Sequence, residues 1–315
     1  MEKNSKIYIA GHKGLLGSSL ERLLKREGHG NLILRSSEVL DLREQTLTRD
    51  FFEREKPEYI FLAAAKVGGL QANNTYRAQF IRDNLQIQTN IIDAAWKNEV
   101  KKLLFVASNC VYPKECEQPM REESLMSGKF ESTNQPFAIA KMAGIEMCEA
   151  YNKEYNTNFI TIIPASLYGP NDNYDMANSH IIPTLIRRCH EAKLDGKDSI
   201  SISGSKNRVR EMIYVDDAAD ACIFLMENYS SSEPINAGIG KGYSIEEIAE
   251  KVKKVVGFNG KVIFDEGKPS GMMQKTLDSS RINSLGFKSK IGLEEGLEKS
   301  YKWFTDNYEC IKSEF

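Results

Sequence analysis

The chain has 315 residues, enough to bury a large core and to form two lobes. Hydrophobic residues make up 41% and charged residues 27%, which is ordinary for a soluble enzyme. The formal net charge of −2 argues against a nucleic-acid partner, which a basic excess would favour. No apolar run is long enough to cross a membrane and the first residues do not form a signal peptide, so we expect no membrane partner and a cytoplasmic location.

The six cysteines are far apart and include no C-x-x-C pair. This spacing favours reduced thiols over a disulfide framework or a zinc site, so we expect no metal. The cysteines are Cys110, Cys116, Cys148, Cys189, Cys222 and Cys310.

The N-terminal stretch carries the pattern of an anion-binding turn. An apolar strand is predicted over residues 6–10, and a helix with leucines at helical intervals opens at Ser18. Between them, glycines with the spacing G-x-x-G-x-x-G let the backbone approach a pyrophosphate, and the free N–H groups of the helix favour negative charge. The alternative is an ordinary glycine-containing loop. The residues predicted to hold a dinucleotide here are Gly11, His12, Lys13, Gly14, Leu15, Leu16 and Gly17.

A second strand is predicted over residues 31–35, and it ends in Arg35. In dinucleotide-binding folds an acidic residue at this point holds the 2′-hydroxyl of NAD, whereas an arginine accommodates the 2′-phosphate of NADP. Lys13 offers a second cation, and Glu38 lies past the strand end, where we expect it to be solvated. The sequence therefore favours NADP(H) as the cofactor.

Strands and helices alternate along the first half of the chain. Further apolar strands are predicted over 58–65, 101–107 and 158–164, with helices over 80–98 and 136–156. This alternation predicts an α/β fold, a Rossmann-type doubly wound parallel sheet, whose ligands bind at the carboxyl ends of the strands.

Beyond residue 170 the pattern changes. A helix is predicted over 180–192, residues 211–217 resemble a return to the main sheet, and an amphipathic helix is expected over 293–307. We therefore predict a smaller C-terminal substrate lobe interleaved with the nucleotide domain. The NADP(H)-binding domain would comprise 1–170 plus about 209–237, and the substrate lobe about 171–208 and 238–315.

Ser108 ends the fourth strand, and Phe137 and Lys141 lie one turn apart on the following helix. In this arrangement the sequence resembles the extended short-chain dehydrogenase/reductases, whose signature is Ser followed by Tyr-x-x-x-Lys. Here the second part reads Phe137-Ala-Ile-Ala-Lys141, with phenylalanine at the tyrosine position.

The sequence more closely resembles the GDP-L-fucose synthase family over nearly its whole length. Members of this family are epimerase-reductases that act on GDP-4-keto-6-deoxy-mannose. The motifs that carry the resemblance are Gly11-His-Lys-Gly14, Ala63-Ala-Ala-Lys-Val-Gly-Gly69, Asn73-Asn-Thr-Tyr76, Ser108-Asn-Cys-Val-Tyr-Pro-Lys114, Asn178-Ser-His180 and Arg210-Glu211.

The resemblance implies roles for individual residues. Ser108 and Lys141 would serve reduction, and Cys110 with His180 would be the epimerising acid/base pair. Helices carrying Asn84 and Lys141 would form a homodimer. Further cofactor contacts would come from Arg35, Ala63, Ala64, Ala107, Lys141, Pro164, Ala165, Leu167 and His180. Substrate contacts would come from Ser108, Asn109, Arg187, Ser203, Arg210 and Asp278.

The implied chemistry suits these residue types. A 4-keto group acidifies the C3 and C5 protons, so a base on one face and an acid on the other invert a centre. Cysteine acts through its thiolate, and histidine titrates near neutrality. Reduction at C4 then takes a hydride from the nicotinamide while a phenol, its pKa lowered by lysine, protonates the carbonyl oxygen.

Each candidate also has a purely structural alternative. Cys110 could be a small buried hydrophobe, His180 a histidine at a helix N-terminus, and Lys141 a solvated charge. Of the adjacent Arg187 and Arg188, one is expected to be surface charge.

Phe137 is the main departure from the family pattern, because it has no hydroxyl to donate a proton. General acid catalysis is worth about 10²–10⁴-fold, so reduction should be impaired on that scale. Since the exchange keeps the ring and deletes one oxygen, we favour an engineered substitution over a natural variant. Ser166, Ser203 and the stretch Met272-Met-Gln274 also depart, and a small Ser203 would admit a larger sugar such as a 4-keto-heptose.

Three hypotheses follow. The first is an NADPH-dependent GDP-4-keto-6-deoxy-sugar epimerase/reductase that forms a homodimer. The second is a C4 reductase of a related GDP-sugar, such as a GDP-4-keto-heptose, without epimerisation. The third is an inactive nucleotide-sugar binding protein, motivated by Phe137.

Overall fold

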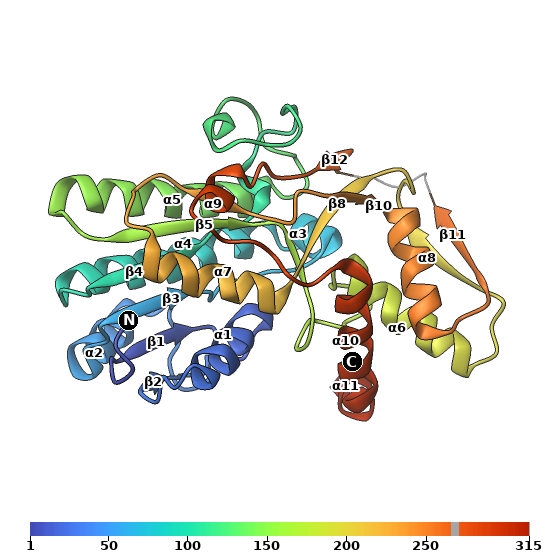
Figure 1. Cartoon of the computed structure of the whole chain (residues 1–315), viewed down its shortest axis with the longest axis horizontal. Coiled ribbons are helices and arrows are strands. Elements are labelled where there is room, and N and C mark those ends of the chain that lie inside the picture. Colours follow the sequence, from blue (N-terminus) through green and yellow to red (C-terminus); the bar gives the residue numbers. More distant parts are fainter. Residues whose placement is uncertain (266–270, 315) are drawn as a thin grey trace.

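The structure is a computed structural model and describes residues 1–265 and 271–314. Its main sheet has six parallel strands in the order β2-β1-β3-β4-β5-β9 (Figure 1). The strands are β1 (Ile7–Ala10), β2 (Leu32–Ile33), β3 (Tyr59–Leu62), β4 (Lys102–Val106), β5 (Phe159–Pro164) and β9 (Ile235–Ala237). The predicted Rossmann-type doubly wound fold is confirmed.

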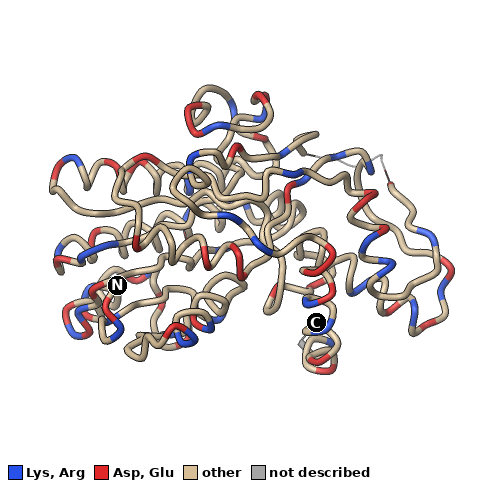
Figure 2. Tube along the Cα trace, in the orientation of Figure 1, with Lys and Arg blue, Asp and Glu red and all other residues tan. Residues whose placement is uncertain are grey.

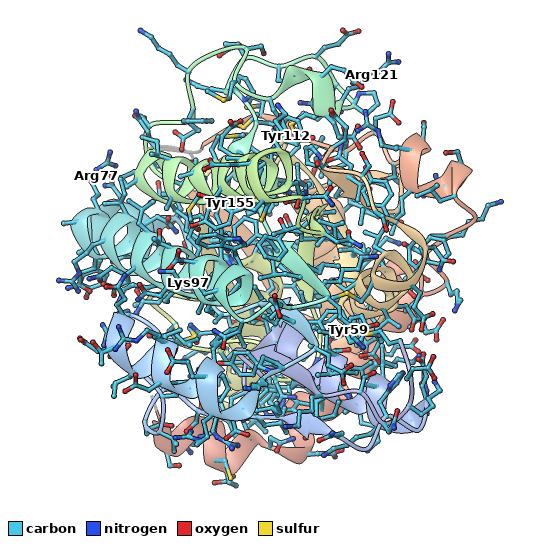
Figure 3. All side chains as sticks on the ribbon, turned by 90° about the vertical axis from the view of Figure 1, so that its left-hand side faces the viewer. Tyr59, Arg77, Lys97, Tyr112, Arg121 and Tyr155 are labelled. Carbon is cyan, nitrogen blue, oxygen red and sulfur yellow. The ribbon has the colours of Figure 1, made fainter. Side chains whose placement is uncertain are left out.

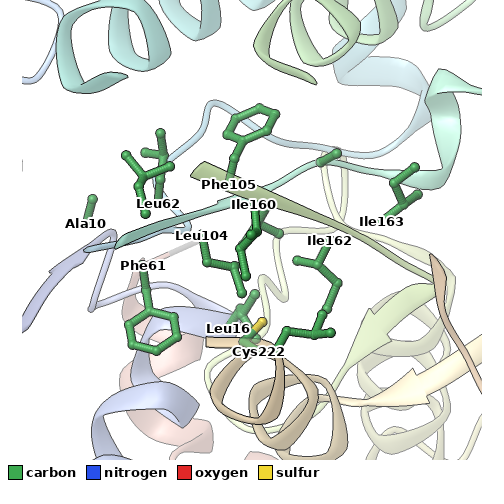
Figure 4. Packing of buried hydrophobic residues seen from close by; sticks show 14 of the residues in the cluster. Ala10, Leu16, Phe61, Leu62, Leu104, Phe105, Ile160, Ile162, Ile163 and Cys222 are labelled. Carbon is green, nitrogen blue, oxygen red and sulfur yellow. The ribbon is translucent and has the colours of Figure 1, made fainter. Parts of the chain in front are cut away.

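Helices cover both faces of this sheet, as strands buried on both sides require. Phe61 and Leu104 point toward the face where Leu16 and Cys222 lie, whereas Phe105 points to the opposite face (Figure 4). The first face carries α1 (Leu15–Arg26) and α7 (Val215–Asn228); the second carries α2 (Gln45–Glu55), α4 (Arg77–Lys97) and α5 (Gln135–Tyr155).

A second hydrophobic cluster lies beside the main sheet, around Tyr168, Leu185 and Phe304. Its sheet has the order β10-β8-β12, with β6 paired to β8, and a separate parallel pair joins β7 to β11. These strands are β6 (Ser166–Tyr168), β7 (Ser199–Ser203), β8 (Val209–Tyr214), β10 (Gly242–Ser244), β11 (Lys261–Asp265) and β12 (Gln274–Lys275). The helices are α6 (Ile181–Leu194), α8 (Ile245–Val256), α10 (Leu293–Asp306) and α11 (Tyr308–Glu314).

The predicted return of residues 211–217 to the main sheet is wrong. Strand β8 pairs with β6, β10 and β12, and the chain rejoins the main sheet through α7 and β9. The last four residues of β8 are buried, as in a central strand of a parallel sheet. An apolar sequence pattern does not indicate which sheet a strand joins. The lobe boundaries stay a prediction; residues 266–270 and 315 of the predicted substrate lobe lie outside the described residues.

Residues 113–134 leave the main sheet after β4 and form the segment at the top of Figure 1. Buried Asn236 on β9 ties this segment to the C-terminal part of the chain. Its Nδ2 donates to the carbonyls of Met120 (3.0 Å) and Asp278 (3.1 Å), and its Oδ1 accepts from the Tyr112 hydroxyl (2.7 Å). Three distant stretches therefore meet next to the loop that follows β4. The short elements are α3 (Leu70–Thr75), α9 (Ser280–Ser284) and the 3₁₀ turns Asn109–Val111 and Glu122–Ser124.

The surface carries both signs of charge. Figure 2 shows basic and acidic residues interspersed along the outer helices, some of them paired one turn apart, such as Lys97 with Asp93. In Figure 3, Lys97 and Tyr155 lie at neighbouring ends of α4 and α5, where Tyr155 stacks on Trp96. Within the described residues, no helix has both the length and the apolar character needed to cross a membrane.

Candidate active site

A cleft of about 1810 Å³ opens at the carboxyl ends of β1, β3, β4 and β5. Residues of α6, β7 and β8 line its other side, so it lies between the two hydrophobic clusters. Ligands bind at this edge in open parallel sheets. The predicted site residues that line it are Gly11, His12, Lys13, Gly14, Leu15, Leu16, Gly17, Arg35, Ala63, Ala64, Ala107, Ser108, Asn109, Cys110, Phe137, Lys141, Pro164, Ala165, Leu167, His180, Ser203 and Arg210.

The glycine turn is closely packed. Gly11 has a φ of +87°, and a Cβ there would lie 2.8 Å from the backbone of Ala64, while a Cβ on Gly17 would overlap the Gly11 carbonyl. Helix α1 begins after Gly14, and no side chain caps its first N–H groups. These free donors beside a close-packed backbone suit the pyrophosphate of a dinucleotide.

Two cations stand where the adenosine end of a dinucleotide would lie. Arg35 donates to Glu55 at 2.9 Å and still lines the cleft. Lys13 pairs with Glu38 at 3.5 Å, and because both side chains are well exposed this pair is weak. An added phosphate would therefore meet two cations, of which only Arg35 is held by a close partner.

Ser108 and Cys110 lie in the tight turn that follows β4. The Ser108 hydroxyl caps this turn by accepting from the Cys110 N–H at 3.4 Å, which holds the Ser108 side chain against the backbone of Cys110. Cys110 is buried, and burial raises the pKa of its thiol. The positive charges of Lys275 and Lys141 and the Ser108 hydrogen bond act in the opposite direction and favour the thiolate.

Lys141 is buried, and its Nζ donates to the Val106 carbonyl at 2.8 Å. The same Nζ lies 4.7 Å from the centre of the Phe105 ring. Burial lowers the pKa of this lysine to about 8, partly offset by Cys110. One turn earlier, Phe137 lies against Phe80 with ring centres 6.1 Å apart, so the cleft wall here presents hydrocarbon.

His180 is the residue immediately before α6, and its side chain is exposed to the cleft. Its position is fixed through Asn178, whose carbonyl accepts from the Gly69 N–H at 2.7 Å. A Cβ on Gly69 would lie 2.5 Å from the Ser179 carbonyl oxygen, so only glycine allows this approach. Desolvation of the imidazole by the surrounding protein lowers the pKa of His180, and the positive charge of Lys275 lowers it further, so both favour the neutral imidazole.

Lys275, which lies on the two-residue strand β12, was not among the residues predicted from the sequence. It lines the cleft and pairs in register with Arg210 on β8. Burial lowers its pKa, and its charge acts on both Cys110 and His180. Only the pairing of two short strands, which no periodic pattern marks, brings Lys275 here.

Two residues predicted to bind substrate lie elsewhere. Arg187 is buried and donates to Glu191 (2.7 Å) and to the Tyr174 carbonyl (2.9 Å), whereas Arg188 lines the cleft. Consecutive helical residues point about 100° apart, so only one of the two arginines can face the ligand. Asp278 lies outside the cleft lining, 3.3 Å from Arg121. Of the two arginines, Arg188 and not Arg187 therefore lines the cleft.

A family model described as the NAD dependent epimerase/dehydratase family matches residues 7–238, more than half of the chain. The chain belongs to this family. The matched range contains the glycine turn, Ser108, Cys110, Lys141 and His180, and Lys275 lies beyond it.

Individual relatives confirm the resemblance to GDP-L-fucose synthases that the sequence motifs indicated. A putative GDP-L-fucose synthase 2 of Arabidopsis thaliana is 50% identical over 98% of this chain and 94% of its own length. A GDP-L-fucose synthetase from Naegleria fowleri bound to NADP is 29% identical, with a TM-score of 0.91 over 98% of this chain and 96% of that one. A GDP-6-OMe-4-keto-L-xylo-heptose reductase from C. jejuni is 39% identical, with a TM-score of 0.94 over 98% and 99% of the two chains.

Proposed function

We propose that this chain is an NADP(H)-dependent epimerase/reductase of a GDP-4-keto-6-deoxy sugar, similar to GDP-L-fucose synthase. The observation that carries this proposal is the convergence of Ser108, Cys110, Lys141 and His180 on a cleft that also contains a dinucleotide-binding turn. The named relatives support the substrate class and the cofactor.

In this proposal, the part of the chain built around the main sheet holds the cofactor. N–H groups of the turn from Gly11 to Gly17 bind the pyrophosphate, and Arg35 with Lys13 faces the 2′-phosphate. Pro164 and Leu167 line the nicotinamide end. When bound, NADPH supplies the hydride that reduces C4.

Epimerisation falls to Cys110 and His180, which both line the cleft. One removes a proton next to the ketone, and the other returns a proton from the opposite face. Ser108 donates a hydrogen bond to the C4 oxygen, and the buried ammonium of Lys141 stabilises negative charge nearby.

Three cations of the cleft suit a diphosphate. Arg188, Arg210 and Lys275 all line the cleft, and burial lowers the pKa of Arg210 to about 10. Arg210 is held in place by the carbonyls of Val209 and Met272, each 2.7 Å away, so its position does not depend on a ligand. A preformed group of cations recognises an anion with little loss of conformational entropy.

The experiment that tests this function compares the chain with Phe137→Tyr, each given NADPH and GDP-4-keto-6-deoxy-mannose. We expect the tyrosine form to produce the reduced, epimerised GDP-sugar at least about 100-fold faster, because the phenol restores the general acid. If the tyrosine form turns over neither this hexose nor a GDP-4-keto-heptose, the enzyme proposal fails and the binding-protein hypothesis stands.

A heptose is the second candidate substrate, favoured by exposed Ser203 in the cleft and by the similarity to the C. jejuni heptose reductase. Ser203→Trp, made in the Phe137→Tyr background, should then lower kcat/KM for a GDP-4-keto-heptose at least about tenfold more than for the hexose, because the indole takes up space. Ser201→Trp serves as control, since Ser201 is exposed on the same strand but does not line the cleft. Equal losses on both sugars would argue against the heptose.

We also propose a cytoplasmic homodimer that pairs α4 and α5 with a second copy. Apolar side chains on one face stay partly exposed on these helices: Ile81 and Leu85, one turn apart on α4, and Ile139 and Met147, two turns apart on α5. In light scattering, Ala143→Arg in the middle of this face should yield monomers, whereas Glu298→Arg on α10 should not.

A further inference from the structure

We infer that this chain epimerises its GDP-4-keto sugar and releases it still as the ketone, so that reduction is left to a separate enzyme. The inference rests on the proposed function but separates its two half-reactions. It is motivated by a cleft that keeps groups for moving protons next to the ketone and presents a phenyl ring where a proton donor is needed.

Among the described residues, Phe137 leaves the reduction of C4 without the phenol that would serve as its proton donor. Hydride addition turns the carbonyl oxygen into an alkoxide, which must be protonated as it forms. Phe137 has no acidic hydrogen, and its ring packs edge-to-face on Phe80.

The neighbouring polar groups do not replace the phenol. The Ser108 hydroxyl donates a hydrogen bond to the carbonyl, but an aliphatic alcohol is too weak an acid to give up its proton unless a base accepts the charge. Lys141 directs its Nζ at the Val106 carbonyl and lies over the Phe105 ring. Its proton would have to cross the space of the missing phenol oxygen. During hydride addition, Ser108 can therefore polarise the C4 carbonyl, but neither Ser108 nor Lys141 transfers a proton to its oxygen.

Epimerisation keeps every group that it needs. The base takes the proton from C3 or C5, the electron pair of that C–H bond moves onto the C4 oxygen as an enolate, and the acid returns a proton to the opposite face. No electrons are gained or lost, and water renews the protons on Cys110 and His180. Their placement does not involve Phe137, because Ser108 fixes Cys110 and the Gly69–Asn178 bond fixes the start of α6.

The product would be an epimerised GDP-4-keto sugar. A ketone with acidic neighbouring C–H bonds continues to exchange protons, so its configuration is preserved only if an NAD(P)H-dependent C4 reductase, or another carbonyl-consuming enzyme, takes it up. With Phe137 as the natural residue, the chain would act between the enzyme that makes the 4-keto sugar and a separate reductase.

The test incubates the full chain with GDP-4-keto-6-deoxy-mannose in D₂O without NADPH and follows the C3 and C5 protons by NMR. NADPH oxidation is then measured with the same substrate, and NADPH binding by fluorescence. Phe137→Tyr is the comparison, and Phe224→Tyr is the matched control, because that ring packs on Phe287 far from the cleft lining.

We expect the chain to incorporate deuterium and to bind NADPH like Phe137→Tyr, while oxidising NADPH at least about 100-fold more slowly. Phe224→Tyr should behave like the parent, and Cys110→Ala should lose the exchange. Oxidation at the rate of Phe137→Tyr, or exchange in Phe137→Tyr alone, would overturn the inference. If no variant exchanges or oxidises although all bind NADPH, the proposed function falls, and the inference with it.

Discussion

A methyl group added at Gly17 would overlap the carbonyl oxygen of Gly11, whereas one added at Gly14 would lie 3.4 Å from the same atom. The two glycines therefore have different tolerances within one turn. Gly17→Ala should weaken NADPH binding at least about tenfold, roughly 1.4 kcal/mol, because the turn must open. Gly14→Ala should stay within about 0.5 kcal/mol of the parent. Fluorescence titration measures both, and equal losses would contradict the role assigned to Gly17.

Lys141 makes a prediction about pH. Its pKa is lowered to about 8 in the folded protein from an ordinary value near 10.5, so between these pH values the unfolded chain binds more protons. Stability contributed by this residue must therefore rise as the pH increases from 8 to 10.5. Lys141→Met should lose about 2–3 kcal/mol of that rise.

Chemical denaturation of parent and variant at pH 8 and pH 10 measures the effect of Lys141. Buried Lys102 also has a pKa lowered to about 8, so the difference between parent and variant is the informative quantity. Lys302→Met, on an exposed lysine of α10, should reproduce the parent at both pH values. A Lys141→Met curve parallel to the parent's would show that the ammonium is solvated.

Among the elements, β8 and β12 depend on one carboxylate. Glu211 is fully buried, and its two oxygens accept from the backbone N–H groups of Ile239 (2.6 Å), Gly240 (2.7 Å) and Leu277 (2.6 Å). It therefore joins the end of β12 to the loop after β9. Lys275 lies two residues before Leu277, so this contact also positions a cleft cation.

Glu211→Gln turns one acceptor into a donor that faces an N–H group. We expect a loss of about 1–3 kcal/mol in stability, and weaker GDP binding by calorimetry, because Lys275 loses its support. Glu247→Gln, at an exposed position of α8, is the matched control, since its carboxylate accepts from the Ser244 N–H at the helix start. GDP affinity that survives an unstable Glu211→Gln would limit Glu211 to a structural role.

The sequence predicted those elements whose pattern is local. Five of the six strands of the main sheet, all but β9, and the long helices α4 and α5 appear within a few residues of their expected bounds, because burial on both faces and helical periodicity leave clear signals. The residues that follow β1, β3, β4 and β5 were also predicted to line the ligand site, because ligands bind at the carboxyl ends of parallel strands. Sheet membership of β8, the choice of Arg188 over Arg187 and the arrival of Lys275 depend on contacts between distant segments, which spacing along the chain does not encode.

At the scale of the whole molecule, the proposed acid and base come from different lobes. Cys110 belongs to the cluster around the main sheet, while His180 begins α6, whose buried face belongs to the second cluster. At low urea we expect deuterium exchange into the substrate to fall before far-UV circular dichroism changes, because small shifts between lobes misplace the pair. Coincident loss of both signals would mean that the lobes separate only on unfolding.

The contact of Gly69 with Asn178 and Ser179 has a consequence for how such a protein can change over generations. A surface loop normally accepts insertions and larger side chains, yet here one added carbon would push against the backbone that leads to His180. Variation in substrate preference is therefore easier at Ser203, where a side chain can grow into open space, than around residues 66–69. Ligand preference and proton chemistry can thus diversify independently in this scaffold.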